Sequence, residues 1–296
     1  MRRLLWLSLA LAFGVALTAH GEVGRAISAL RSLAEPLLGH GTAIAPRFDR
    51  FYTGMVEALP PQQKVERALE LAINDYSGAS DYIVEHAQSW RGQFARSEKL
   101  EALLSTASSS RRMEVRMAAI EVSLAEYGLE KSAAEVDRLL ARREADRVNA
   151  GPWALWNVAM IGARGVDRER VFGVLLTAIR DADDQQRTWA VDALARFGGA
   201  EVIGPLLDVA AHDNSVVVQE RAFCGIAQSG TLQLAERYHA VPGLLAIAEN
   251  AQASHQQHEW AFQALREITE IYDLPQETAA WRDALGRAGL LNSVAE

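Results

Sequence analysis

The 296-residue sequence predicts an all-α protein made of antiparallel helix pairs, and three observations support this prediction. Aromatic residues are only 7% of the chain, whereas alanine and leucine supply much of its 49% hydrophobic content. This mixture favours helices over strands. Apolar helical segments recur at a nearly constant spacing, and glycine follows most of them at the same distance. A repeated helical pattern of this kind predicts a stacked array.

The N-terminus carries the pattern of a secretory signal peptide, predicted over residues 1–20. Two arginines precede an apolar run, residues 4–17, and the small residue Ala19 offers a cleavage position. The run is shorter than the about 20 residues that a membrane span needs. Because Leu17 is a poor residue three positions before the cut, an uncleaved membrane anchor remains an alternative. The expected location is periplasmic or secreted.

The next segment, residues 21–95, is expected to form an N-terminal helical cap that contains a possible degenerate repeat. Residues 22–58 predict one or two helices, and the two prolines at 60–61 end this section. Two looser apolar patterns follow over 65–73 and 82–90. They indicate one further helix pair before the regular array begins.

The regular array is predicted over residues 96–273, where five helical segments share one register. Their central apolar residues are Leu124, Val158, Leu194, Ile226 and Leu265. One turn earlier stand Ile120, Ala154, Ala190, Ala222 and Ala261, and one turn later stand Gly128, Gly162, Gly198 and Gly230. Alanine suits a close approach of two helices, and glycine accepts the left-handed conformation that ends many helices. The central residues should therefore form one common buried row.

Most of these helices follow another helix with its own apolar pattern, over 171–180, 202–211 and 241–250. The predicted N-caps and first-turn prolines are Asp183 with Gln186, Ser132 with Glu135, Ser254 with Gln257, Asn214 or Ser215, Pro152 and Pro242. Because one helix pair cannot bury its apolar face alone, neighbouring pairs are expected to stack. Residues 274–296, with Trp281 and Leu285, are expected to cap the far end.

These residues resemble the HEAT-repeat family, whose unit is two antiparallel helices joined by a turn that often carries Asp or Asn. The matching features are the turns at 181–184 and 212–214 and the Val115-Arg116 pair that opens one second helix. The resemblance covers roughly residues 97 to 272 and implies an α-α superhelix, an armadillo-like solenoid. It weakens in the repeat over 131–165 and in the lengthened last pair.

Charge and motifs argue against several function classes. The net charge of -8 and the scarcity of lysine disfavour a nucleic-acid partner. The single cysteine, Cys224, excludes a disulfide framework within the chain and is expected to be a small buried residue. The acidic turn at 181–184 is interpreted as helix capping rather than a calcium loop. The spacing of His255, His258 and Glu259 permits a metal cluster, but a solvated helix start is the preferred interpretation, and no metal or cofactor is expected.

One position of the shared register carries large side chains in four consecutive units. The candidate binding residues are Trp153, Trp189, Arg221 and Trp260. Equivalent positions of a solenoid align, and the family resemblance places second helices on the concave face. Since Trp and Arg are enriched in binding hot spots, they predict a Trp/Arg stripe that binds a partner. The alternative is that the rings pack between repeats as core, because they lie only about 100° from the buried position.

The expected function is therefore that of an exported, non-catalytic scaffold that binds a protein or peptide through a solenoid groove. No nucleophile elbow, phosphate-binding glycine loop or zinc-protease helix is present in the sequence. One alternative is a membrane-tethered accessory subunit of an envelope complex. A less favoured alternative is an enzyme of unassigned type.

Overall fold

The computed structural model describes residues 46–291, and every regular element in this range is helical. A parallel bridge between Arg47 and Ser77 is the only β-type pairing among these residues. The predicted all-α class is therefore confirmed. The predicted signal peptide lies outside the described residues. Between residues 46 and 291, no helix combines the length and the apolar character that a membrane crossing needs.

The helices follow one another without interruption by any other regular structure. They are α3 Arg50–Glu57, α4 Pro61–Ile73, α5 Ala79–His86, η1 Ala87–Trp90, α6 Glu98–Ser108, α7 Met113–Glu126, α8 Ala133–Ala145, α9 Gly151–Gly162, α10 Arg168–Ala178, α11 Asp184–Phe197, η2 Ala200–Val202, α12 Ile203–His212, α13 Val216–Ala227, α14 Leu234–Tyr238, α15 Val241–Glu249, α16 His255–Thr269 and α17 Thr278–Arg287. The elements η1 and η2 are 3-10 turns.

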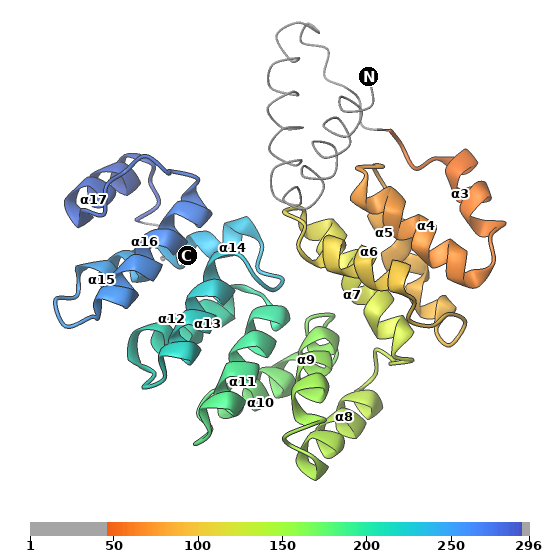
Figure 1. The fold of residues 1–296 in the computed structure, drawn as a ribbon, viewed down its shortest axis with the longest axis horizontal. Helices are drawn as coiled ribbons and strands as arrows, with labels where there is room; N and C mark the ends of the chain where they lie inside the picture. The colour runs from red at the N-terminus through yellow and green to blue at the C-terminus, as the bar shows by residue number, and fades with distance from the viewer. Residues whose placement is uncertain (1–45, 292–296) are drawn as a thin grey trace, which may run out of the picture. The chain divides into compact units, whose positions relative to one another are not determined.

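Consecutive helices pack in pairs, as the sequence predicts. The pairs are α6 with α7, α8 with α9, α10 with α11, α12 with α13, and α15 with α16 (Figure 1). The second helices α9, α11, α13 and α16 also contact one another in this order, and we call these four helices the second-helix row. The short helix α14 lies between the last two pairs and packs on α16, which explains why the last interval of the register is longer.

The predicted burial of the five central residues is confirmed. Leu124, Val158, Leu194, Ile226 and Leu265 are fully buried and belong to one hydrophobic cluster. The four alanines one turn earlier are also fully buried, which fits close contact between helices. The C-terminal residues Trp281 and Leu285 pack into the same cluster through α17. The register therefore identifies the core of the array.

The helix α7 departs from the regular arrangement. It packs against α4, α5 and α6, and it makes at most peripheral contact with α9. The buried residues accordingly form two clusters, one from Val56 to Ala125 and one from Leu124 to Leu285, which meet within α7. The second-helix row thus begins at α9, although the sequence register of α7 continues it.

Buried charges lie where α7 meets the next unit. The carboxylate of Glu121 is 2% exposed and accepts hydrogen bonds from Arg164 at 2.8 Å and from Lys131 at 3.0 Å. A buried carboxylate is tolerated only when it is paired in this way. Two cations from the following loops therefore fix the position of α7 at the place where its helix contacts are weakest.

A second polar contact joins α7 to a segment far along the chain. The guanidinium of Arg116 donates to the carbonyl of Gln228 at 2.8 Å and to that of Gly230 at 3.1 Å. The same side chain donates to the carbonyl of Ser110 at 2.5 Å, close to its own helix. Burial lowers the pKa of Arg116. The N-terminal end of α7 is thereby bound to the loop that follows α13.

Three of the four predicted glycines have a positive φ, although Gly198, with a ψ of -174°, does not adopt the left-handed helical conformation that was predicted. Gly128, Gly198 and Gly230 have positive φ angles of 69°, 66° and 73° after their helices end. Gly162 is instead the last residue of α9 and has no positive φ. A Cβ atom at Gly162 would lie 2.7 Å from Cγ1 of Val171, so close packing of the next helix, not a cap, requires glycine there.

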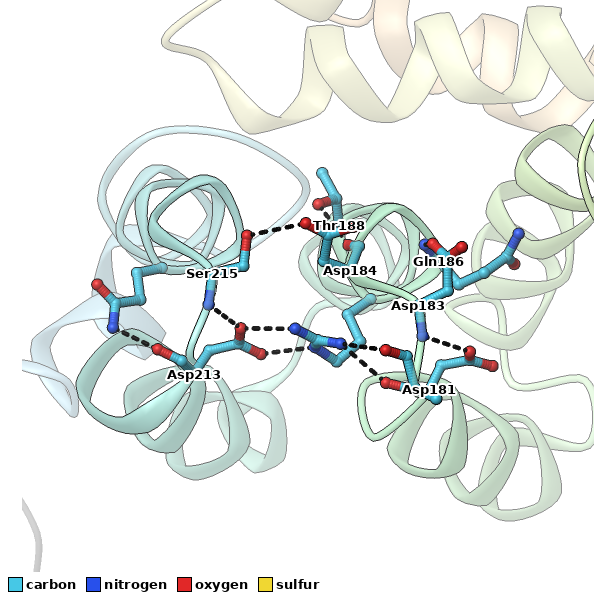
Figure 2. Close-up of polar contacts among 10 residues, drawn as sticks. Asp181, Asp183, Asp184, Gln186, Thr188, Asp213 and Ser215 are labelled. Atoms are coloured by element: carbon cyan, nitrogen blue, oxygen red, sulfur yellow. Dashed lines mark hydrogen bonds and ion pairs between the residues drawn. The ribbon is translucent and has the colours of Figure 1, made fainter.

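The turn between α10 and α11 is built from capping and bridging side chains. The carboxylate of Asp183 accepts a hydrogen bond from the backbone of Gln186 at 3.0 Å, which confirms the predicted cap. Figure 2 shows how this turn faces the next one. Arg187 donates to both carboxylate oxygens of Asp213, at 2.8 and 2.9 Å, and to the carbonyl of Asp181 at 2.9 Å. Both turns are thereby fixed to α11.

The other predicted caps are mostly confirmed. The hydroxyl of Ser132 accepts from the backbone of Glu135 at 3.2 Å, and Ser254 forms a reciprocal capping box with Gln257. Ser215 occupies the N-cap position of α13 without a side-chain capping bond. Each satisfied cap stabilises a helix start by roughly 1 kcal/mol.

Ion pairs connect neighbouring units at the spacing of the repeat. Four hydrogen-bonded pairs join residues 33 or 34 positions apart, namely Arg170–Asp137, Arg147–Asp181, Arg168–Glu201 and Arg282–Glu249. Solvent-exposed pairs of this kind contribute little to stability. These pairs instead fix the relative positions of neighbouring units, because a shifted stacking would separate every pair.

Candidate functional site

The second-helix row leaves one set of side chains partly exposed. They occupy the register position of Trp189 in each helix and the positions three and, in all but α9, seven residues later. We call this set the second-helix face. They are Trp153, Trp156, Trp189, Asp192, Arg196, Arg221, Cys224, Gln228, Trp260, Gln263 and Glu267. Residues three and seven apart lie on the same side of a helix, so this face runs along all four helices.

The four predicted binding residues all lie on this face. Trp153, Trp189 and Trp260 are half-buried, and Arg221 is exposed. Trp153 and Trp260 pack against the large hydrophobic cluster with part of their surface. The rings are therefore partly packed in the core, as the alternative predicts, and partly exposed, as the binding prediction requires.

Trp153 makes contacts within the chain on its aromatic ring. Its ring makes an edge contact with Tyr127, with 5.4 Å between the centroids. The guanidinium of Arg142 lies 4.5 Å from the centroid of the Trp153 ring. A cation from the same chain therefore already occupies the aromatic face that a partner's cation would use.

A second group connects α9 with α11. The indole nitrogen of Trp156 donates to the carbonyl of Trp189 at 3.3 Å, and the guanidinium of Arg196 lies 5.2 Å from the centroid of the Trp156 ring. The Nε atom of Arg196 is buried and has no hydrogen-bond partner among the described residues. Aromatic and cationic groups are thus held side by side at the centre of the face.

Asp192 lies beside Trp189 on the same helix and carries the perturbed charge of the face. Burial raises the pKa of its carboxyl group, and the nearby Arg221 and Arg196 oppose this shift only in part. The closest contact to Arg221 is 3.6 Å, which is longer than a good hydrogen bond. The ionised carboxylate is therefore incompletely compensated.

We predict that Asp192→Asn makes the protein more stable at neutral pH. The raised pKa means that the folded state disfavours the ionised form, so wild-type stability increases as the pH falls through the folded-state pKa. The asparagine variant lacks this gain. Urea denaturation between neutral and acidic pH should show the variant's advantage closing on acidification. An advantage that widens toward acid would contradict this assignment.

A small cavity opens between α13 and α16. It has a volume of about 110 Å³ and is lined by Glu220, Phe223, Cys224, Trp260 and Glu267, among others. The Phe223 and Trp260 rings are 5.8 Å apart. The prediction that Cys224 is buried is wrong, because its side chain is half-exposed at this cavity. Its position three residues after Arg221 places it on the exposed face.

A larger hollow lies elsewhere. It has a volume of about 600 Å³ between the first helices α10 and α12, and Ile179, Val209, Asp208 and His212 are among its lining residues. His212 and Asp208 pair with each other there at 3.0 Å. Three lining groups have shifted pKa values: those of Asp181 and Asp213 are lowered and that of Arg187 is raised. These groups are already paired within the chain, Asp213 with Arg187 and Asp181 with Arg147, so we place the candidate site on the second-helix face.

The suggested histidine cluster does not assemble a metal site. His255 pairs with Glu259 at 3.4 Å, and Nε2 of His258 lies 2.9 Å from the carbonyl of Asn250. No group of three or more potential ligands of the His, Cys, Asp or Glu type occurs within residues 46–291. These side chains instead organise the turn between α15 and α16.

The residues predicted from the sequence occupy one register position of this face in each helix, and the other positions were not predicted. The missed residues include Trp156, Asp192, Cys224 and Glu267. Trp156, Asp192 and Cys224 each follow a predicted residue by three positions, and Glu267 follows Trp260 by seven. Extending the aligned register by one and two helical turns supplies the signal that finds them.

Comparisons with known proteins give no family for this chain. No family model matches it, and no curated protein matches it either.

Proposed function

We propose that this protein is an exported, non-catalytic scaffold of HEAT-like repeats, arranged as a solenoid, that binds a protein or peptide along its second-helix face. One observation carries the proposal: the four helices of the second-helix row present partly exposed aromatic and charged side chains at equivalent positions. Burying large aromatic and arginine side chains at a partner's surface supplies most of the energy in many interfaces. Repeated units supply a long surface for an extended partner.

The packing of the face supports a binding role over a purely structural one. Trp189 and Trp260 remain half-buried, and the Nε donor of Arg196 has no hydrogen-bond partner in the part of the chain that the structure describes. Full burial of these rings in the monomer would have stabilised the fold more. Leaving them partly open has a stability cost that binding a partner offsets.

Site-specific photocrosslinking tests the proposal. Gln263 is exposed on α16, and replacing it with p-benzoylphenylalanine places the crosslinker on the second-helix face. The matched control places it at Thr177, which is exposed on the first helix α10. Incubation with the native exported fraction should give a discrete adduct from position 263 and none from position 177. N-terminal sequencing of the purified mature chain checks export, with His20 expected as its first residue.

The aromatic residues can then be tested in the same assay. Trp189→Ala and Trp260→Ala should each reduce the adduct from position 263 about tenfold, the usual effect of removing a hot-spot aromatic. Thermal melting of each variant separates binding from folding. Equal adducts from positions 263 and 177 would overturn the proposal. It would also be overturned if the adduct of the tryptophan variants fell only in proportion to their loss of folded protein.

A further inference from the structure

The cavity between α13 and α16 has the size of a pocket for one side chain. Its volume of about 110 Å³ is well below the roughly 300–1,000 Å³ of ordinary small-molecule pockets. It can accept the end of a single side chain of a bound segment. Pockets of this kind usually anchor one residue of a partner.

The chemistry of the lining selects the kind of side chain. Trp260 and Phe223 supply aromatic surface, while Glu220 and Glu267 supply two carboxylates. Neither carboxylate has a hydrogen-bond or ion-pair partner among the described residues, and no basic residue lines the cavity. An apolar occupant would desolvate both carboxylates without compensation, which is unfavourable.

The neighbouring basic side chains have their nearest polar contacts with groups other than Glu220 and Glu267. Arg221 lies 3.6 Å from Asp192, and Arg266 donates to the carbonyl of Leu274 at 3.3 Å. Arg116 donates to the carbonyl of Gln228, whose residue forms one edge of the cavity. No side chain of the described fold therefore neutralises the two carboxylates at the cavity.

We propose that this cavity binds the guanidinium or ammonium group of an arginine or lysine side chain from the partner segment. The cation lies against Trp260, where an aromatic face attracts it, and between the carboxylates of Glu220 and Glu267. This inference rests on the proposed function and assigns the chemistry of one anchor residue: a basic side chain.

The only cysteine of the chain provides a direct measurement, because Cys224 lines the cavity. The rate of its alkylation by neutral iodoacetamide, followed by intact-mass spectrometry, reports occupancy. The probes are acetyl-Gly-Arg-Gly-amide and its lysine counterpart, with the citrulline peptide as the uncharged isostere. Protection should reach about tenfold when a basic peptide is about nine times above its dissociation constant, whereas citrulline should leave the rate unchanged.

Charge removal tests the same pocket. The double variant Glu220→Gln/Glu267→Gln should raise the peptide dissociation constant about tenfold, because each accessible charge pair contributes a factor of a few. Glu85→Gln/Glu101→Gln removes the same charge from exposed sites on α5 and α6 and should change nothing. Trp260→Leu removes the aromatic face and should also weaken peptide binding. Trp260→Phe keeps a ring in case Trp260→Leu fails to fold, and it should weaken binding to a smaller extent.

The two proposals fail differently. Equal protection by the citrulline peptide, or an unchanged dissociation constant in Glu220→Gln/Glu267→Gln, overturns the basic anchor while leaving the crosslinked adduct at position 263 intact. Absence of that adduct overturns the scaffold function. Peptide protection of Cys224 remains a separate measurement in either case.

Discussion

Replacing Arg237 with methionine is expected to lower the free energy of unfolding by about 3 kcal/mol. Arg237 is 5% exposed, and its guanidinium donates to the carbonyls of Leu232 at 3.0 Å, Gly225 at 3.2 Å and Ser229 at 2.9 Å, and also to that of Ile226. Methionine fills the volume of the aliphatic stem but leaves these acceptors without their donor. Urea denaturation at neutral pH gives the change directly.

The loss of stability in Arg237→Met arises because the Arg237 side chain binds the C-terminal end of α13. A cation there complements the negative end of the helix dipole and satisfies carbonyls that the helix cannot satisfy itself. Arg237→Lys keeps the charge but not the planar set of donors, so an intermediate loss is expected. Arg287→Met, on the exposed face of α17, is the matched control and should change stability little. An equal effect of Arg237→Met and Arg287→Met would refute this assignment.

The pH dependence follows from the same burial. Burial, with a smaller contribution from Arg116, lowers the pKa of Arg237 to about 10. The unfolded state therefore binds more protons than the folded state above this pH, and the contribution of Arg237 to stability rises as the pH rises through about 10. The stability difference between wild type and Arg237→Met should widen in that alkaline range.

Introducing alanine at Gly230 is expected to destabilise the protein by about 3 kcal/mol or more. Its φ of 73° is unfavourable for a residue with a side chain, and an added Cβ would lie 2.1 Å from the carbonyl oxygen of Ala195. That oxygen accepts a hydrogen bond from the backbone of Thr231 at 2.9 Å. The loop must therefore move away and lose this bond.

Gly128 provides a control with the same backbone strain. Its φ is 69°, and an added Cβ would meet nothing within 4 Å. Gly128→Ala should therefore cost only about 1 kcal/mol, the conformational part of the effect. Thermal or urea denaturation of the two variants separates conformational strain from steric clash. Similar losses at both sites would mean that the loop after α13 yields easily.

Features that depend on local interactions could be predicted from the sequence, whereas features that depend on tertiary contacts could not. Central residues such as Leu194 and Leu265 are identified by periodicity, since a buried helix face repeats every turn. Caps such as Asp183 are also local. The sequence spacing predicts a cap at Gly162 because it does not show that Val171 approaches this residue. Its glycine is required by a tertiary contact.

The arrangement of α7 could not be predicted for a related reason. Its residues keep the register of the later units, yet the helix packs with its N-terminal neighbours. The decisive contacts are the pairing of Glu121 with Arg164 and the bonds from Arg116 to the loop after α13. A register describes faces of a helix but not which neighbour each face meets. The candidate site was predicted at four positions, and its other positions follow from the sequence only when the register is extended by one and two helical turns.

The bond between Arg116 and Gln228 has a consequence for the order in which the chain folds. Adjacent helix pairs form from segments close in sequence, whereas this bond closes a loop of 112 residues. The entropic cost of closure grows with loop length, and such contacts slow folding until the intervening segments are compact. We therefore expect the pairs from α8 to α13 to assemble first, with Arg116 reaching its acceptors only in the final kinetic phase.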